Sequence, residues 1–292
     1  MKLISTITIC IIMFLAGGCS NKKKFIEAEF EATVDKAHKT KNPELILSYL
    51  AKTSEMPEIS KANACIQIGI IFIKSKNDED AEQSFKKALI LVDSKVDDMP
   101  VLIRYTALLQ LARINARKER YLKSKFNYEK LLKECLKHPD LSQKFNISKI
   151  YQELSSVNCA LKDYKTQYEL LNRALQEITA KNIKNDTEAA LIYALMSDCC
   201  NNLAKYQNAV MWGKKSLEIF KKEGKIYPVA ISYYNIAQGL HGMKKDSEAI
   251  NAMKASVEYS SKYNQGSNRC FKNASQLLKK WSMEPERQQK PQ

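Results

Sequence analysis

Apolar and small side chains recur at every third or fourth position along most of the chain, in runs separated by short polar segments. The clearest pair of runs is Cys65-x2-Ile68-Gly69-x2-Phe72 followed by Ala81-x3-Phe85-x2-Ala88. Residues at this spacing lie on one face of an α-helix, and Asn77-Asp78 between the runs is typical of a turn. Alternating apolar and polar runs bounded by Gly or Pro, which are typical of strands, are missing. The pattern therefore predicts an all-α fold built from helix pairs.

The paired pattern occurs five times. A small residue on the first helix of each pair marks the register, at Gly69, Ala112, Ser155, Ser197 and Ala237, and these positions are 43, 43, 42 and 40 residues apart. Self-similarity at a period of this size is typical of helical-repeat arrays. Small residues are expected where two antiparallel helices approach closely, and large residues where neighbouring pairs pack together.

The pattern resembles the tetratricopeptide repeat, in which a large residue, Leu-Gly and Tyr lie on the first helix and Ala, Phe and Ala lie on the second. The resemblance covers about residues 60–265 and implies an α-solenoid, which is a superhelix of stacked helix pairs. The period exceeds the ~34 residues usual in the family, which implies longer helices or longer links. Asn115 and Asn158 stand where the family prefers Tyr. The resemblance concerns packing and implies no catalytic chemistry.

Segments on both sides of the five repeats are expected to cover the ends of the array, because a terminal repeat has no neighbour to bury its apolar face. The repeats occupy residues 61–264, between a helix pair in residues 25–60 and a closing helix in residues 265–282. The expected helices outside the repeats are Phe25–His38, Glu44–Lys52 and Ser267–Trp281. Residues 283–292 are polar and contain two prolines, so we expect them to be disordered.

The first residues have the pattern of a secretory signal peptide. Lys2 supplies a positive charge, and Leu3 to Leu15 form an apolar run shorter than the roughly 20 residues that span a bilayer. The run ends in Leu15-Ala16-Gly17-Gly18-Cys19, which resembles the lipobox of bacterial lipoproteins, although Ala16 stands where that motif usually has Leu. The resemblance implies removal of residues 1–18 as a signal peptide and a lipid on Cys19. Secretion without lipidation is the alternative.

The residues after this cysteine bear on the destination and on the membrane as a partner. Position 20 is Ser rather than the Asp that retains lipoproteins in the inner membrane. We therefore expect a lipid-anchored protein of the bacterial outer membrane that faces the periplasm. Lys22, Lys23 and Lys24, in a linker over residues 19–24, would favour contact with an anionic membrane surface.

Charge alone does not define the partner. The chain carries a formal charge of +15, and basic chains often bind nucleic acid. The aromatic residues, however, fall at repeat-core positions rather than beside a basic cluster, so we do not expect nucleic acid as a partner. Lysines scattered over solvated helix faces, which keep a long surface soluble, are the alternative explanation of the charge.

No pattern in the sequence indicates catalysis, a cofactor or a metal. Gly-rich phosphate loops and nucleophile elbows are missing. Cys65 and Cys200 fall on core positions, where cysteine acts as a small apolar filler; a redox or metal role for Cys199-Cys200 is the alternative. Three histidines occur, none at metal-ligand spacing from another or from a cysteine cluster: His38, His138 and His241. We therefore expect a protein that is not an enzyme.

Binding in stacked repeats usually occurs in the concave groove that the first helices form. Nine polar residues are expected to line this groove: Arg113, Arg117, Gln152, Asp198, Asn201, Asn202, Tyr234, Gln238 and His241. Such a lining suits an extended peptide, and the basic end at Arg113 and Arg117 suits a terminal carboxylate.

The leading interpretation is a non-enzymatic adaptor or scaffold lipoprotein of the bacterial cell envelope that binds a protein or peptide partner. The alternative is a regulatory or sensory repeat module that binds a small ligand or a signalling partner. A third interpretation, a periplasmic enzyme on a repeat scaffold, requires an acid–base or metal cluster in the folded groove.

Overall fold

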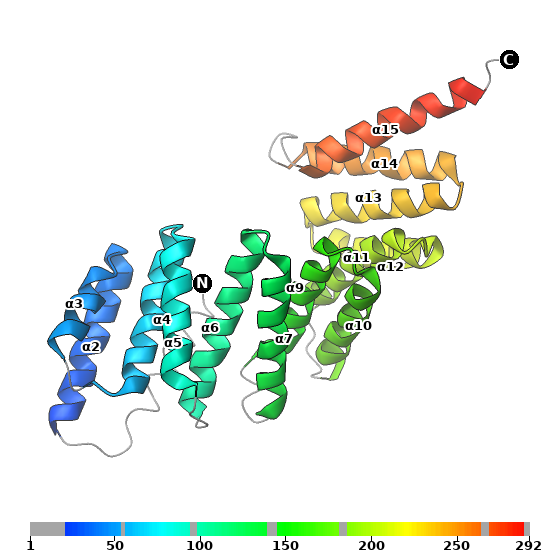
Figure 1. The fold of residues 1–292 in the computed structure, drawn as a ribbon. Helices are drawn as coiled ribbons and strands as arrows, with labels where there is room; N and C mark the ends of the chain where they lie inside the picture. Colours follow the sequence, from blue (N-terminus) through cyan, green and yellow to red (C-terminus); the bar gives the residue numbers. More distant parts are fainter. Residues whose placement is uncertain are drawn as a thin grey trace. The chain divides into compact units, whose positions relative to one another are not determined.

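The computed structural model describes residues 21–53, 56–93, 98–138, 145–180, 186–263 and 269–288. Within these ranges it contains thirteen α-helices and no strand (Figure 1). The predicted all-α, helical-repeat fold is confirmed. Cys19, the predicted lipidation site, lies outside the described residues.

The chain divides into two compact units, which meet in sequence between Phe145 and Asn146. The first unit contains α2 (Asn21–Thr40), α3 (Glu44–Lys52), α4 (Glu58–Lys74), α5 (Asp78–Val92), α6 (Asp98–Arg117) and α7 (Tyr121–Lys137). The second unit contains α9 (Ile147–Ala160), α10 (Tyr164–Ala180), α11 (Asp186–Asn202), α12 (Tyr206–Lys222), α13 (Ile226–Gly242), α14 (Asp246–Ser261) and α15 (Arg269–Gln288). Consecutive helices pack against each other in pairs, from α4 with α5 to α13 with α14 (Figure 1).

Each of the five small marker residues lies buried on the first helix of a pair, where the second helix approaches closely. A Cβ atom on Gly69 of α4 would lie 2.7 Å from the ring of Phe85 on α5. In the second unit, the Ser197 hydroxyl of α11 donates a hydrogen bond to the main-chain oxygen of Ala209 on α12, at 2.7 Å. A larger side chain at either position would push the two helices apart.

The turn inside each pair has a repeated backbone conformation. Seven positions after each marker residue, a residue other than glycine adopts a left-handed conformation with positive φ: Lys76, Glu119, Lys162, Ala204 and Lys244. The next amide then donates to the carbonyl five residues earlier, as in Arg120 N–H to Asn115 O at 2.8 Å. This hydrogen bond closes the end of the first helix in the manner of a Schellman motif. The repeat therefore conserves its turn geometry without the glycine that such turns usually carry.

The two asparagines at the family's Tyr position are buried, Asn115 on α6 and Asn158 on α9. The side-chain nitrogen of each donates to the carbonyl four residues earlier, Leu111 O at 2.8 Å and Leu154 O at 2.9 Å. A buried amide group without hydrogen bonds is costly. These contacts pair the amide nitrogen of each asparagine and so lower the cost of placing Asn where the family prefers Tyr.

The terminal helices extend beyond the ranges expected from sequence. Helix α2 begins at Asn21 and so includes residues 22–24, and α15 continues to Gln288, through part of the segment expected to be disordered. None of the described helices combines the length and the apolar character that a membrane-spanning segment needs.

Candidate functional site

The second unit contains a cavity of about 470 Å³ that is lined by side chains from α9, α11, α13 and α15. Three of the side chains predicted for the binding groove line it: Gln152 on α9, Asp198 on α11 and Tyr234 on α13. Three of the four helices are the first helices of consecutive pairs, as expected for a binding surface of stacked repeats.

Asp198 is the most unusual group in this cavity. Burial raises the pKa of its carboxyl group. Within the described part of the chain, its carboxyl oxygens have no hydrogen-bond partner, and the Asn202 side chain donates at 3.1 Å to the Asp198 main-chain oxygen instead. Asp198 is partly buried, and a carboxylate withdrawn from water is stabilised when it is paired or hydrogen-bonded. Asp198 is therefore primed to accept a hydrogen bond or a positive charge from a molecule that enters the cavity.

Two neighbouring polar side chains, Gln152 and Tyr234, can also form hydrogen bonds with a ligand. The buried Gln152 donates from Nε2 to Ser148 Oγ at 3.2 Å and to Glu188 Oε1 at 3.1 Å, which leaves its Oε1 as the atom available to a ligand. Burial, and secondly the nearby Cys270 and Asp198, raise the pKa of Tyr234. The Tyr234 hydroxyl therefore stays protonated and can donate a hydrogen bond.

Four other predicted residues lie on the same helices but do not line the cavity, namely Asn201, Asn202, Gln238 and His241. Asn202 and Gln238 bond within their own helices, to Asp198 O and to the Tyr234 hydroxyl, whereas Asn201 and His241 join neighbouring helices. Asn201 Nδ2 donates to Asn235 O on α13 at 2.9 Å, and His241 Nδ1 lies 2.9 Å from Asp246 Oδ1 on α14. The His241 ring also stacks on Trp281 of α15, with 4.3 Å between ring centroids.

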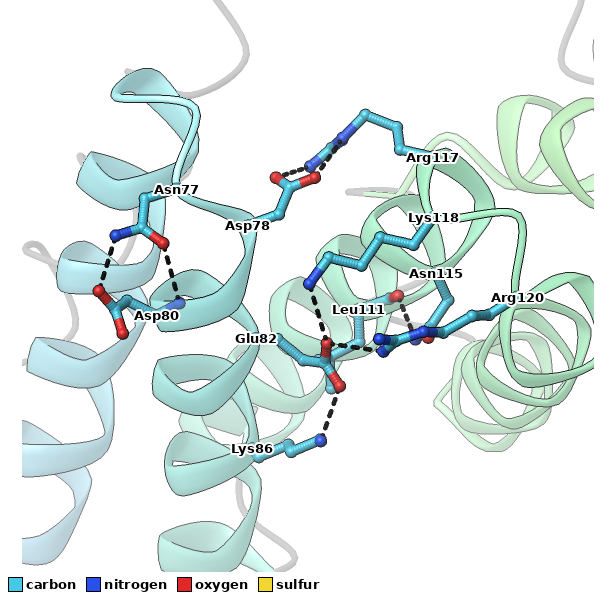
Figure 2. A network of polar contacts seen from close by, with 10 residues as sticks. All are labelled: Asn77, Asp78, Asp80, Glu82, Lys86, Leu111, Asn115, Arg117, Lys118 and Arg120. Atoms are coloured by element: carbon cyan, nitrogen blue, oxygen red, sulfur yellow. Dashed lines mark hydrogen bonds and ion pairs between the residues drawn. The ribbon is translucent and has the colours of Figure 1, made fainter.

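Arg113 and Arg117, the predicted basic end of the groove, both lie on α6 in the first unit. Arg117 donates two hydrogen bonds to the carboxylate of Asp78 on α5, from Nη2 at 2.6 Å and from Nε at 3.0 Å (Figure 2). A carboxylate ligand at Arg117 would therefore have to displace an internal bidentate partner. Capture of a terminal carboxylate by the two arginines stays a prediction.

Sequence reasoning missed the contribution of α15, which brings Arg269, Cys270 and Asn273 to the cavity wall. The sequence pattern predicts this helix only as a closing cap. Its buried Ala274 packs in one core cluster with Ile236 and Ala237 of α13, so the helix packs like the first helix of a further repeat. The signal in the sequence was Ala274, a small residue with apolar residues one turn before and after it on α15, as on the first helix of a repeat.

The six cysteines within the described ranges are free thiols. Burial raises the pKa of Cys135 and of Cys199 to about 12, and that of Cys200 to about 11. Because the thiolate is the reactive and metal-binding form, such thiols are inert fillers. Among the described residues, no group of three or more His, Cys, Asp or Glu side chains is placed to hold a metal ion.

Neither the protein-family models nor the curated protein sequences gave a match to this chain. Solved structures are similar in fold. BtubC (BKLC) from P. vanneervenii is 15% identical with a TM-score of 0.59, over 84% of this chain and 93% of that one. RapI in its apo form is 14% identical with a TM-score of 0.60, over 89% of this chain and 70% of that one.

YrrB, described as a TPR protein with an unusual peptide-binding site, is 16% identical with a TM-score of 0.54, over 80% of this chain and 98% of that one. At such low identity these structures show the fold alone. Together with the five helix pairs and their small marker residues, they show that this chain has a tetratricopeptide-like helical-repeat fold.

Proposed function

We propose that this protein is a non-enzymatic scaffold that binds a protein or peptide segment in the cavity between α9, α11, α13 and α15. The observation that carries the proposal is Asp198, which lines a cavity of about 470 Å³ and whose carboxylate has a raised pKa and no side-chain partner among the described residues. YrrB, a repeat protein of similar fold, is described as having a peptide-binding site, which supports the class of ligand.

Lys149 and Arg269 line the cavity as well, but Asp198 favours a segment with a basic side chain. A lysine ammonium or an arginine guanidinium beside Asp198 would neutralise the partly buried carboxylate and recover part of the free energy of its desolvation. The rings of Tyr227 and Tyr234 also line the cavity and would add attraction for a cation. Gln152 Oε1 is placed to accept a hydrogen bond from a peptide N–H.

The same cavity supports a second candidate, a sensory module for a small molecule. Its volume of about 470 Å³ falls within the roughly 300–1,000 Å³ of small-ligand pockets. A small ligand and a peptide both need Asp198, but they differ in size. Competition between a selected peptide and small amines therefore separates the two candidates.

Selection from a displayed peptide library against the whole protein, followed by affinity measurement with Asp198→Asn, tests the proposal. We expect selected peptides to contain Lys or Arg, and the substitution to weaken their binding at least about tenfold, or ~1.4 kcal/mol. Asp186→Asn, an exposed carboxylate at the start of the same helix, is the matched control and should leave affinity unchanged. Equal affinity for both variants would reject the cavity as the binding site.

We further propose that the scaffold belongs to the bacterial cell envelope, as a lipoprotein anchored through Cys19 in the outer membrane and facing the periplasm. The support is the apolar run that ends in small residues before Cys19. Binding by the second unit would then occur on a protein held at the membrane surface.

A further inference from the structure

The first unit contains a second cavity, of about 530 Å³, lined by residues of α5, α6 and α7. We call it the α5–α7 groove. Its walls are mostly apolar, from Leu89, Leu108 and Leu111 to Leu122 and Phe126. Leu122 is 73% exposed and Phe126 is 65% exposed, and the two lie one helical turn apart on α7. Large apolar side chains this exposed, beside a cavity, are typical of a surface that a partner covers.

The groove also contains a buried polar group with unmet bonding capacity. Asn115 on α6 is only 4% exposed and lines the groove. Its nitrogen donates to Leu111 O, but no group in the described part of the chain donates to its Oδ1 (Figure 2). An unpaired amide oxygen in an apolar surround is costly. The oxygen itself is fully buried, so a donor from a partner could reach it only if the groove opened on binding.

The rim of the groove is positively charged. Glu82 on α5 contacts three cations, Lys86 at 2.7 Å, Arg120 at 3.2 Å and Lys118 at 3.7 Å (Figure 2). Burial alone would raise the pKa of Glu82, but Lys86, Arg120 and Lys118 hold it below its ordinary value. One carboxylate therefore faces three cations, and this cluster keeps a net positive charge.

Two further lysines on α7, Lys123 and Lys130, line the same groove. Apolar walls and a cationic rim are thus combined over one cavity. The complementary surface is an apolar side chain flanked by carboxylates.

We propose that the α5–α7 groove is a second docking site, which takes an acidic amphipathic segment of a partner protein, with a large apolar side chain between Asp or Glu residues. The partner's apolar side chain would pack on Leu122 and Phe126, and its carboxylates would lie against Lys123 and Lys130. A second copy of this chain is a poor occupant, because the chain itself carries a formal charge of +15. An anionic membrane would match the charge, but a lipid surface would not fill the cavity of about 530 Å³ beside Leu122 and Phe126.

Peptide selection against the full chain, with a displayed library of helix-favouring sequences, tests this site. We expect binders in which Leu, Ile or Phe is flanked by Asp or Glu. Their affinity should fall at least about tenfold in Leu122→Ser/Phe126→Ser and in Lys123→Glu/Lys130→Glu, and should weaken with rising salt. Both pairs consist of exposed or partly exposed side chains, so the fold should persist, and unchanged helical circular dichroism would verify it.

Matched controls lie on the same helices outside the groove. Ile90→Ser removes another exposed apolar side chain, 77% exposed on α5, and Lys87→Glu/Lys133→Glu reverses two charges on α5 and α7 that do not line the groove. Both should bind as the unchanged protein does. If the controls lost binding as well, the effect would not be specific to the groove, and the proposal would be overturned.

Two other outcomes would also overturn it. The first is a set of selected peptides without an excess of acidic residues. The second is binding of vesicles of anionic phosphatidylglycerol that depends on Leu122 and Phe126, which would make the groove a membrane contact. Asp198→Asn should not affect this site, so failure here and failure of the proposed peptide cavity can be told apart.

Discussion

Gly69 is the residue at which the packing of the repeat is tightest. A methyl group there would lie 2.7 Å from the fully buried Phe85 ring. We expect Gly69→Ala to cost about 1–3 kcal/mol in overpacking, offset by about 1 kcal/mol of gained helix propensity. The net effect should be a loss of up to about 2 kcal/mol in the free energy of unfolding, measured by urea denaturation.

The cause can be isolated with a second substitution. In a Phe85→Leu background the smaller side chain leaves room for the methyl group, so Gly69→Ala should become neutral or stabilising. A double-mutant cycle would then give a coupling free energy between the two positions. Additive effects would mean that the ring does not limit the size of residue 69.

His38 links α2 to α4 and should make the first unit sensitive to acid. Its Nε2 lies 2.8 Å from Gln67 Oε1, and its Nδ1 lies 3.1 Å from Lys74 Nζ. Burial, with Lys74, lowers the pKa of His38 below 6.5, although Gln67 and Asp35 act in the opposite direction. As pH falls below 6.5, the unfolded chain takes up the proton before the folded one does. The free energy of unfolding should therefore fall between 6.5 and the lowered folded pKa.

Thermal unfolding across this pH range checks the expectation. His38→Gln should remove this part of the pH dependence, whereas His138→Gln, at the end of α7, should keep it. The same acid slope in all three proteins would mean that His38 does not control it.

Among single residues, the sequence located side chains on the correct helices but not their partners. Gln152, Asp198 and Tyr234 converge on one cavity because the repeat spacing places them on adjacent first helices. Arg117 could not be assessed in this way, because its partner Asp78 lies 39 positions upstream. Such an ion pair depends on how two helix pairs pack, and periodicity carries no information about it.

At the scale of the element, the turn inside each pair carries a measurable strain. Ala204 adopts a φ of 55° between α11 and α12, a conformation that costs residues with a Cβ about 1–2 kcal/mol. We expect Ala204→Gly to raise the free energy of unfolding by about 0.5–1 kcal/mol after the added entropy of the unfolded chain is counted. Differential scanning calorimetry would measure the shift in melting temperature.

Ala255→Gly, within α14, is the comparison for this prediction. There the backbone is helical, so the same chemical change should lower stability by about 1 kcal/mol. Opposite signs at the two positions identify the backbone conformation as the cause, and equal signs would contradict it.

The presence of each helix pair was predicted correctly from the sequence, whereas the first residue of α2 and the last residue of α15 were not. The helix pairs follow from the spacing of Gly69, Ala112, Ser155, Ser197 and Ala237, because close packing of two helices requires a small residue at a fixed place. The extension of α2 back to Asn21 and of α15 to Gln288 was not predicted. Lysine-rich and glutamine-rich stretches have good helix propensity but no apolar period, so a pattern-based reading ends the helix too early.

At the scale of the whole molecule, the described residues form two units that each carry one candidate binding surface with its own chemistry. The cavity of the second unit has an unpaired carboxylate, Asp198, and the α5–α7 groove has a cationic rim around Leu122 and Phe126. One site would prefer a basic ligand and the other an acidic one, so a scaffold with both could bind two different segments that do not compete with each other.

The anchor that would place both surfaces at a membrane depends on a single thiol, and its removal is the last prediction. Cys19→Ala should abolish incorporation of radiolabelled palmitate in cells and release the protein from the membrane fraction, because no lipid could then be attached. Cys10→Ala changes the other cysteine of the amino-terminal segment and should keep both label and membrane association. Labelled Cys19→Ala protein would refute lipidation at this residue, whereas unlabelled wild-type protein in the soluble fraction would favour secretion without a lipid.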